Sequence, residues 1–225
     1  MSCVTKKLTP HARMSVIFRF VTILLAVSIC IFETCATSEN LKRKYPMKKT
    51  LTLILIVIIT IGAMVALVHY IKMDRFSFAW ILNFLLMFLV VFFTAVLKSP
   101  LTSTYFNEKS WERRGKIYER LGINYFRKLL VLIGWEKVIR KSFPVAHNSK
   151  ALVNLHYQTK KSELEHLIIL IIVLGFNIFV AVKFGVVKSL PLLILNVLLN
   201  LYPILLQRYN RPRIERAMNL SKRVI

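Results

Sequence analysis

Four long runs of the sequence contain no Asp, Glu, Lys or Arg, and they restrict the fold more than any other feature. They cover residues 51–71, 77–97, 166–182 and 189–206. A helix needs about 20 residues to cross a bilayer, and in lipid only a helix satisfies its own backbone polar groups within one segment. The sequence therefore predicts an all-α integral membrane protein with four transmembrane helices. A core helix of a soluble protein is the alternative for any single run, but four such runs in one short chain argue against it.

The charged residues fill the segments between these runs. The chain is 56% hydrophobic, yet it carries 33 Lys and Arg against 10 Asp and Glu, a net charge of +23. Disordered basic tails are poor in apolar residues, and soluble domains spread their charges along the chain. The segregation seen here excludes the first class and disfavours the second. It is typical of a multi-spanning membrane protein with basic loops.

The cations gather on one predicted side of the membrane. Residues 98–165 carry a net charge of +8 and residues 207–225 one of +5, whereas the turns 72–76 and 183–188 hold two Lys or Arg each. Loops rich in Lys and Arg stay cytoplasmic. We therefore expect a multi-pass protein of the cell membrane, with its middle segment and C-terminus in the cytoplasm and its short turns outside.

This pattern divides the chain into five parts. They are an N-terminal extension (1–46), a first transmembrane hairpin (47–97), a basic cytoplasmic or interfacial helical segment (98–165), a second transmembrane hairpin (166–206) and a basic cytoplasmic tail (207–225). The extension contains an apolar stretch, residues 14–32, that is interrupted by Arg19. Three interpretations of it stay open: an extra N-terminal apolar helix, a signal-like segment with a basic start, or a start codon placed too early.

The middle segment is charged over residues 108–120 and mixes apolar and basic residues over residues 121–139. Such a mixture predicts a helix in the membrane interface, with Tyr125, Phe126 and Trp135 at the depth of the headgroups. A small cytoplasmic subdomain is an equal alternative. Nucleic-acid binding, a third use of basic segments, is not expected, because attraction to anionic lipids already explains cations beside a membrane.

Residues 159–166 (TKKSELEH) stand where a cytoplasmic helix is expected to enter the membrane as the third span. Glu163 and His166 are three residues apart and so share a helix face. A carboxylate beside an imidazole fixes its tautomer, and such a pair can act as a general base for a hydroxyl nucleophile. The alternative is a solvated helix end, with the carboxylate complementing the helix dipole and His166 at headgroup level.

Residues 207–213 (QRYNRPR) follow the last span. A plain cytoplasmic anchor needs cations only, whereas this run interleaves Gln, Tyr, Asn and Pro with three arginines. Pro212 disfavours a helical backbone at the residue before it, which predicts a broken helix that displays the guanidiniums. Forked guanidiniums suit a phosphate or a carboxylate.

Polar residues also lie inside the last span. Asn196, Asn200 and Gln207 fall along one helical stripe, and polar groups in a span usually face the interior of the bundle. Hydrogen bonding between helices is the alternative to ligand binding at this stripe. Pro191 and Pro203 are expected to kink the same helix.

The sequence offers neither a metal site nor a cofactor motif, and we predict neither group. The three cysteines, Cys3, Cys30 and Cys35, all lie near the N-terminus, so the rest of the chain holds no thiol nucleophile and no disulfide. No P-loop, dinucleotide, GxSxG or HExxH fingerprint is present. His147 and His156 are solitary, and we interpret them as surface residues.

Taken together, residues 159–166, the apolar hairpin after them and residues 207–213 resemble the bacterial glycosyl-4,4'-diaponeurosporenoate acyltransferase family. The resemblance covers roughly residues 98–215 and includes Pro100, Tyr105, Phe106, Gly115, Lys116, Trp135, Asn200, Pro203 and Ile204. Enzymes of this family are small integral membrane proteins. They are credited with the last step of staphyloxanthin synthesis, in which a fatty acyl chain is esterified to the primary hydroxyl of a glucose on a C30 carotenoid acid.

The resemblance implies acyl transfer at the cytoplasmic membrane face, from a fatty acyl donor such as an acyl-CoA to a glycolipid acceptor. In this hypothesis His166, oriented by Glu163, removes the proton from a sugar hydroxyl. The arginines hold the anionic part of the donor or stabilise the oxyanion. The residues assigned to substrate binding are Asn200, Gln207, Arg208, Tyr209, Asn210, Arg211 and Arg213.

Other functions stay open at this level. One is a different lipid-modifying enzyme that acts on a prenyl or phospholipid headgroup, and another is a non-catalytic membrane subunit whose basic face recruits acidic lipids or a partner. A transporter is disfavoured, because the four runs contain no carboxylate to couple ions. The sequence does not specify the acyl donor, the acceptor or the oligomeric state.

Overall fold

The computed structural model describes residues 46–134 and 149–223, and this part of the chain is helical, without a strand. Four of its helices are long and apolar enough to cross a membrane, which confirms the predicted all-α class. The three cysteines, the predicted extra N-terminal helix, Trp135 and His147 lie outside the described residues. The elements are α2 (Pro46–Tyr70), α3 (Phe76–Leu97), η2 (Thr104–Phe106), η3 (Ser110–Gly115), α4 (Lys116–Arg120), α5 (Ile123–Leu132), α7 (Ser149–Phe184), α8 (Val186–Asn196), η4 (Val197–Leu201) and α9 (Tyr202–Arg223).

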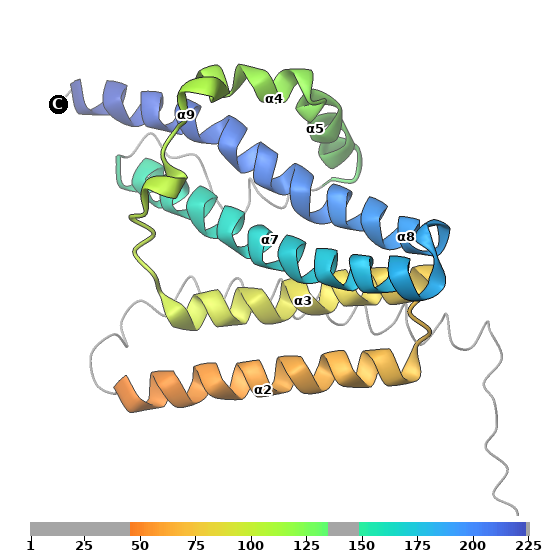
Figure 1. The fold of residues 1–225 in the computed structure, drawn as a ribbon. Helices are drawn as coiled ribbons and strands as arrows, with labels where there is room; N and C mark the ends of the chain where they lie inside the picture. The colour runs from red at the N-terminus through yellow and green to blue at the C-terminus, as the bar shows by residue number, and fades with distance from the viewer. Residues whose placement is uncertain (1–45, 135–148, 224–225) are drawn as a thin grey trace, which may run out of the picture.

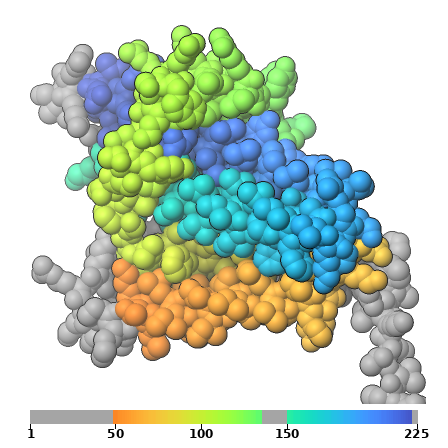
Figure 2. All heavy atoms as spheres, viewed as in Figure 1, coloured from red at the N-terminus to blue at the C-terminus, as the bar shows by residue number. Residues whose placement is uncertain are grey.

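The long helices lie in a row, with α2 beside α3, α3 beside α7, and α7 beside α8 and α9 (Figure 1). Residues 71–75 join α2 and α3 into one hairpin, and Gly185, with a φ of +97°, joins α7 to α8 in a second. α2 packs mainly on α3 and lies along one edge of the molecule (Figure 2). The two predicted hairpins are therefore present, and α3 of the first packs against both α7 and α8 of the second.

The helices meet through apolar side chains. Phe78, Leu82 and Leu86 of α3 pack with Ile169 and Val173 of α7, and all five are fully buried. Many other apolar side chains point outward, among them Leu51, Ile58, Val65, Ile171, Val182, Val187 and Ile194. Because contiguous exposed apolar surface is unfavourable in water, this outer surface suits the hydrocarbon of a bilayer.

The fourth long helix is made of α8, the π-helical turn η4 and α9 in succession. Pro191 lies inside α8, and Pro203 is the second residue after the π-helical turn. A proline supplies no N–H to the helix ladder, and a local widening to the π form is one way in which a helix accommodates this loss. Asn200 lies in this widened turn and is buried.

Residues 98–132 lead from the end of α3 to the far side of α9, where α4 and α5 pack (Figure 1). Arg113, Arg114 and Gly115 have φ values of +47°, +56° and +86°, so the chain makes a left-handed turn there. A Cβ atom at Gly115 would lie 3.2 Å from the carbonyl oxygen of Tyr209 on α9. Glycine is therefore required both for the backbone conformation and for the close approach to α9.

α5 is amphipathic. Ile123 and Phe126 are buried against Tyr118 and Tyr209, which attaches α5 to α9. On its other side apolar residues are exposed, namely Tyr125, Leu129, Val131, Leu132 and Ile133. A helix with this surface suits the membrane interface, and that location stays a prediction.

Replacement of Gly115 by Ala should destabilise the fold. The added methyl group makes the existing positive φ unfavourable and crowds the Tyr209 carbonyl, at a cost of about 1–3 kcal/mol. Gly62→Ala in α2 is the matched control, because its new methyl group would meet no atom within 4 Å. Thermal unfolding in detergent should show a lower midpoint for Gly115→Ala alone. Equal midpoints for the two variants would contradict the close approach.

Candidate functional site

Four charged side chains are buried together where α7, α9 and η3 meet. They are Glu163 on α7, Arg208 and Arg211 on α9, and Glu112 in η3, with exposed fractions of 0%, 9%, 3% and 2%. We call them the charge cluster. Two carboxylates face two guanidiniums, so the cluster is neutral as a whole. Such burial is tolerated only when each charge is paired and hydrogen bonded.

Arg208 joins all three elements of the cluster. Its Nε donates to Glu163 Oε1 at 2.7 Å, and its Nη1 donates to Glu112 Oε1 at 2.5 Å. Nη2 donates to the carbonyl oxygen of Tyr105 at 3.1 Å, and the guanidinium lies 4.7 Å from the centre of the Tyr105 ring. Each nitrogen of this guanidinium therefore has a partner within the protein.

Arg211 is occupied in the same way. Its Nη2 donates to Glu163 Oε2, and its Nη1 donates to the carbonyl oxygen of Phe106 at 2.8 Å. Nε donates to Thr159 Oγ1 at 3.4 Å. Glu163 thus holds one arginine with each of its oxygens, which ties α7 to two successive turns of α9.

The prediction that Pro212 breaks the helix and displays the guanidiniums is wrong. α9 continues through Pro212 to Arg223, and both Arg208 and Arg211 point into the protein. An interior proline costs about 3 kcal/mol in an isolated helix. The charge-assisted hydrogen bonds of Arg208 and Arg211, which both lie in the turn before Pro212, offset this cost and hold the helix together.

The predicted pairing of Glu163 with His166 is also not observed. Both oxygens of Glu163 bind arginines, and Nδ1 of His166 instead faces Oδ1 of Asn200 at 3.4 Å. The three-residue spacing does put the two side chains on neighbouring turns of α7. The cations on α9 attract the carboxylate more strongly than a neutral imidazole does.

Asn200 connects His166 to two further helical positions. Its Nδ2 donates to Oδ1 of Asn83 at 2.7 Å and to Oδ1 of Asn196 at 2.8 Å. Sequence reasoning missed Asn83, which lies on α3. A signal was present, because Asn83 is the only amide side chain in the uncharged run 77–97, and an amide in a span usually has a partner on another helix.

The other predicted binding residues lie around the charge cluster. Gln207 donates from Nε2 to Ser162 Oγ at 3.2 Å, and Asn210 is half-buried. Tyr209 is buried and donates to Glu119 at 3.1 Å, while the guanidinium of Arg213 stacks on its ring at 3.5 Å. Arg213 is the one arginine of the run 207–213 that is substantially exposed, at 42% of its side chain.

Two tyrosines of the 98–132 segment adjoin the cluster. Burial, followed by the neighbouring carboxylate of Glu112, raises the pKa of Tyr118 well above its usual range. Burial also raises the pKa of Tyr105, with a further contribution from Glu163. Both phenols therefore stay protonated, and Tyr118 donates its proton to Glu112 in a hydrogen bond of 2.8 Å.

Another histidine, His156, does have a carboxylate partner, and sequence reasoning missed it. Nε2 of His156 on α7 lies 2.9 Å from Oε1 of Glu215 on α9, and both groups are partly exposed. Since the two residues are distant in sequence, spacing gave no signal for this pair. A shallow groove beside it is lined by Phe106, Glu108, Glu112, Arg208, Arg211, Pro212 and Glu215.

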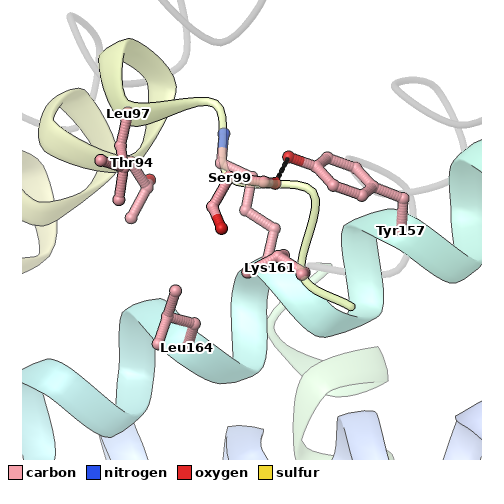
Figure 3. A pocket seen from close by; sticks show the side chains of 7 residues that line it. Thr94, Leu97, Ser99, Tyr157, Lys161 and Leu164 are labelled. Carbon is pink, nitrogen blue, oxygen red and sulfur yellow. Dashed lines mark hydrogen bonds between the residues drawn. The ribbon is translucent and has the colours of Figure 1, made fainter. Parts of the chain in front are cut away.

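A small pocket lies between the end of α3 and α7 (Figure 3). It is lined by Thr94, Leu97, Ser99, Leu101, Tyr157, Lys161 and Leu164, and the Tyr157 hydroxyl closes one side by donating to the Ser99 carbonyl at 2.9 Å. The hydroxyl of Thr94, one of the lining residues, donates to Glu165. Within residues 46–134 and 149–223, no group of three or more His, Cys, Asp or Glu side chains could hold a metal ion.

Comparison with known proteins gives one family. The model described as glycosyl-4,4'-diaponeurosporenoate acyltransferase matches residues 102–220. These residues include the whole charge cluster, His166 and Asn200, whereas Asn83 lies before them. No curated protein and no solved structure matches the chain.

Glu163→Gln should destabilise the protein strongly, because it leaves two buried guanidiniums with one carboxylate. The removal of one partner from a buried ion pair costs about 3–5 kcal/mol. Asp74→Asn is the matched acid-to-amide control, since the Asp74–Lys188 pair is 3.8 Å long and more exposed, and such pairs contribute about 0–1 kcal/mol. Thermal unfolding in detergent compares the two. A similar small change for both would contradict the central role of Glu163.

Proposed function

We propose that this chain, which belongs to the glycosyl-4,4'-diaponeurosporenoate acyltransferase family, transfers a fatty acyl group to a sugar hydroxyl of a glycosylated carotenoid-type lipid. The observation that carries the proposal is the family match over residues 102–220, supported by a histidine within that region held by a neutral amide. Four apolar helices make the chain compatible with a multi-pass membrane protein. A membrane enzyme has direct access to such an acceptor and to the acyl chain of the donor.

The proposed general base is His166. Its imidazole takes the proton of the sugar hydroxyl as the oxygen attacks the carbonyl carbon of a thioester donor such as an acyl-CoA. The tetrahedral intermediate then expels the thiolate, and the imidazolium returns the proton to the leaving sulfur. The new ester bond replaces the thioester bond, and the histidine ends as it began.

The charge cluster acts in this proposal as a positioning device. Arg208 and Arg211 have their nitrogens occupied by protein groups, so we assign them to holding α9 against α7, one turn from His166. Contact with the anionic part of the donor falls to Arg213 because of its exposure, although its Nη1 and Nη2 also donate to the Tyr209 carbonyl and to Glu119. Gln207 and Asn210 stay assigned to the sugar hydroxyls.

The sidedness of the reaction follows from the charge pattern. The 98–165 segment and the tail carry the cations, which favours a cytoplasmic location for both. The charge cluster and the apolar face of α5 then lie toward the cytoplasmic leaflet, where a water-soluble acyl donor is available. A non-catalytic basic subunit is disfavoured, because the family is one of acyltransferases.

Loss of the base should abolish the product. Cells that express the chain with a glycosylated carotenoid acid should accumulate a lipid heavier by one acyl ester, measured by mass spectrometry of lipid extracts. His166→Ala should reduce this product by about 100-fold or more, while His69→Ala, on the exposed surface of α2, should not change it. Undiminished product from His166→Ala at equal membrane abundance would overturn the assignment of the base.

His156→Ala distinguishes the role of His156, whose partner Glu215 lies on α9, from that of His166, whose partner Asn200 lies in η4. His156 pairs with the partly exposed Glu215, and we assign this pair no part in the chemistry. The variant should retain acyl transfer within a few-fold. If His156→Ala abolishes the product and His166→Ala does not, the base is the His156–Glu215 pair.

A further inference from the structure

The geometry points to a specific tautomer of His166: we propose that Asn83 and Asn196 fix the orientation of the Asn200 amide, so that His166 carries its proton on Nδ1 and presents a free lone pair on Nε2. Asn83 and Asn196 are thereby positioning residues for the reaction. Only the catalytic role of this tautomer rests on the proposed function. The tautomer itself can be measured without any substrate.

The orientation of Asn83 is set by its own helix. Its Nδ2 donates to the carbonyl oxygen of Ala79 at 2.8 Å. A carbonyl oxygen can only accept, so the nitrogen of this amide must lie on the side of Ala79. The other atom of the amide, Oδ1, therefore points at Asn200, and it can only accept.

Asn196 is oriented in the same manner by a neighbouring helix. Its Nδ2 donates to the carbonyl oxygen of Leu170 on α7 at 3.2 Å. Its Oδ1 is thereby directed at Asn200, 2.8 Å away. Two acceptors on two different residues now converge on one amide group.

These two acceptors allow only one orientation of the Asn200 amide. Its Nδ2 carries two N–H groups, and one goes to Asn83 and the other to Asn196. A flipped amide would place its oxygen against two other oxygens and leave buried groups unsatisfied, which is costly in a low-dielectric interior. The Oδ1 of Asn200 consequently faces His166.

Nδ1 of His166 lies 3.4 Å from this oxygen and must donate to it. A neutral imidazole has one proton, so Nε2 is left as the acceptor. An amide suits this purpose better than a carboxylate, because it orients the ring without adding a negative charge that favours the imidazolium. The carbonyl oxygen of Leu199, four residues before Pro203, also faces the ring. It can only accept, so in the proposed tautomer it shares the single Nδ1 proton with Asn200.

The test is solid-state NMR of the full chain in lipid bilayers, with ¹⁵N-labelled histidine. The His166 resonances are those that disappear in His166→Gln. The expected result is a protonated Nδ1 and an unprotonated Nε2 at neutral pH. A neutral ring with its proton on Nε2, or an imidazolium that donates to both Asn200 and Leu199, would overturn the proposal.

Variants of the amide frame, by which we mean Asn83, Asn196 and Asn200, give a second, independent readout. Asn83→Leu combined with Asn196→Leu removes both acceptors, frees Asn200 to rotate and should shift His166 toward a mixture of tautomers. Acyl transfer should fall by about tenfold, which is the loss of roughly one buried hydrogen bond. Asn177→Leu is the control: this buried amide bonds to the Ser189 carbonyl within the second hairpin and should leave the tautomer and the rate unchanged. An unchanged His166 spectrum in the double variant would also overturn the proposal.

The two claims fail separately. If the NMR shows the Nδ1 tautomer and His166→Ala still forms product, the amide frame is correct and the assignment of His166 as base is wrong. If His166→Ala abolishes the product and the NMR shows the Nε2 tautomer, the base stands and the frame is wrong. Membrane abundance and the thermal midpoint of each variant show whether it has folded.

Discussion

The bond between Glu163 and the two arginines of α9 is the interaction on which the rest of the structure depends. Glu163 is fully buried and binds Arg208 with one oxygen and Arg211 with the other. An unpaired charge in this interior costs several kcal/mol, so α7 and α9 can neither slide nor rotate without breaking the pairing. Arg208 extends the same constraint to Glu112, which attaches the segment with α4 and α5 to the side of α9.

The proposed site for chemistry lies next to this constraint. His166 follows Glu163 by about one helical turn, and its partner Asn200 lies in the π-helical turn before α9. The charge cluster therefore fixes the position of α7 relative to α9 along their axes. The amides of Asn83, Asn196 and Asn200 fix the rotation of the imidazole. Charged groups set the position, whereas the partner of the proposed base is a neutral amide.

The sequence was sufficient for the apolar helices, the hairpins, the family and the two motifs that meet at the site. It was insufficient for the pairing within the site. The Glu163–His166 spacing describes one helix, whereas the carboxylate binds cations on another. The effect of Pro212 was judged from local backbone preference, which the buried ion pairs override. The lone amide in the run 77–97 marks Asn83 as a candidate, but its contact with Asn200 and the His156–Glu215 pair join distant segments, and no local pattern specifies those partners.

The central claim is that Glu163 and Arg211 act as one unit that holds α7 and α9 in the catalytic arrangement. A double-mutant cycle with Glu163→Gln and Arg211→Gln tests it most directly, with thermal unfolding and the acyl-transfer rate measured on the same bilayer preparations. We predict strong non-additivity, with the double variant no worse than the poorer single variant and a coupling of about 1–3 kcal/mol. Losses that add within about 0.5 kcal/mol would contradict the claim, because they would show that the ion pair does not determine the position of His166.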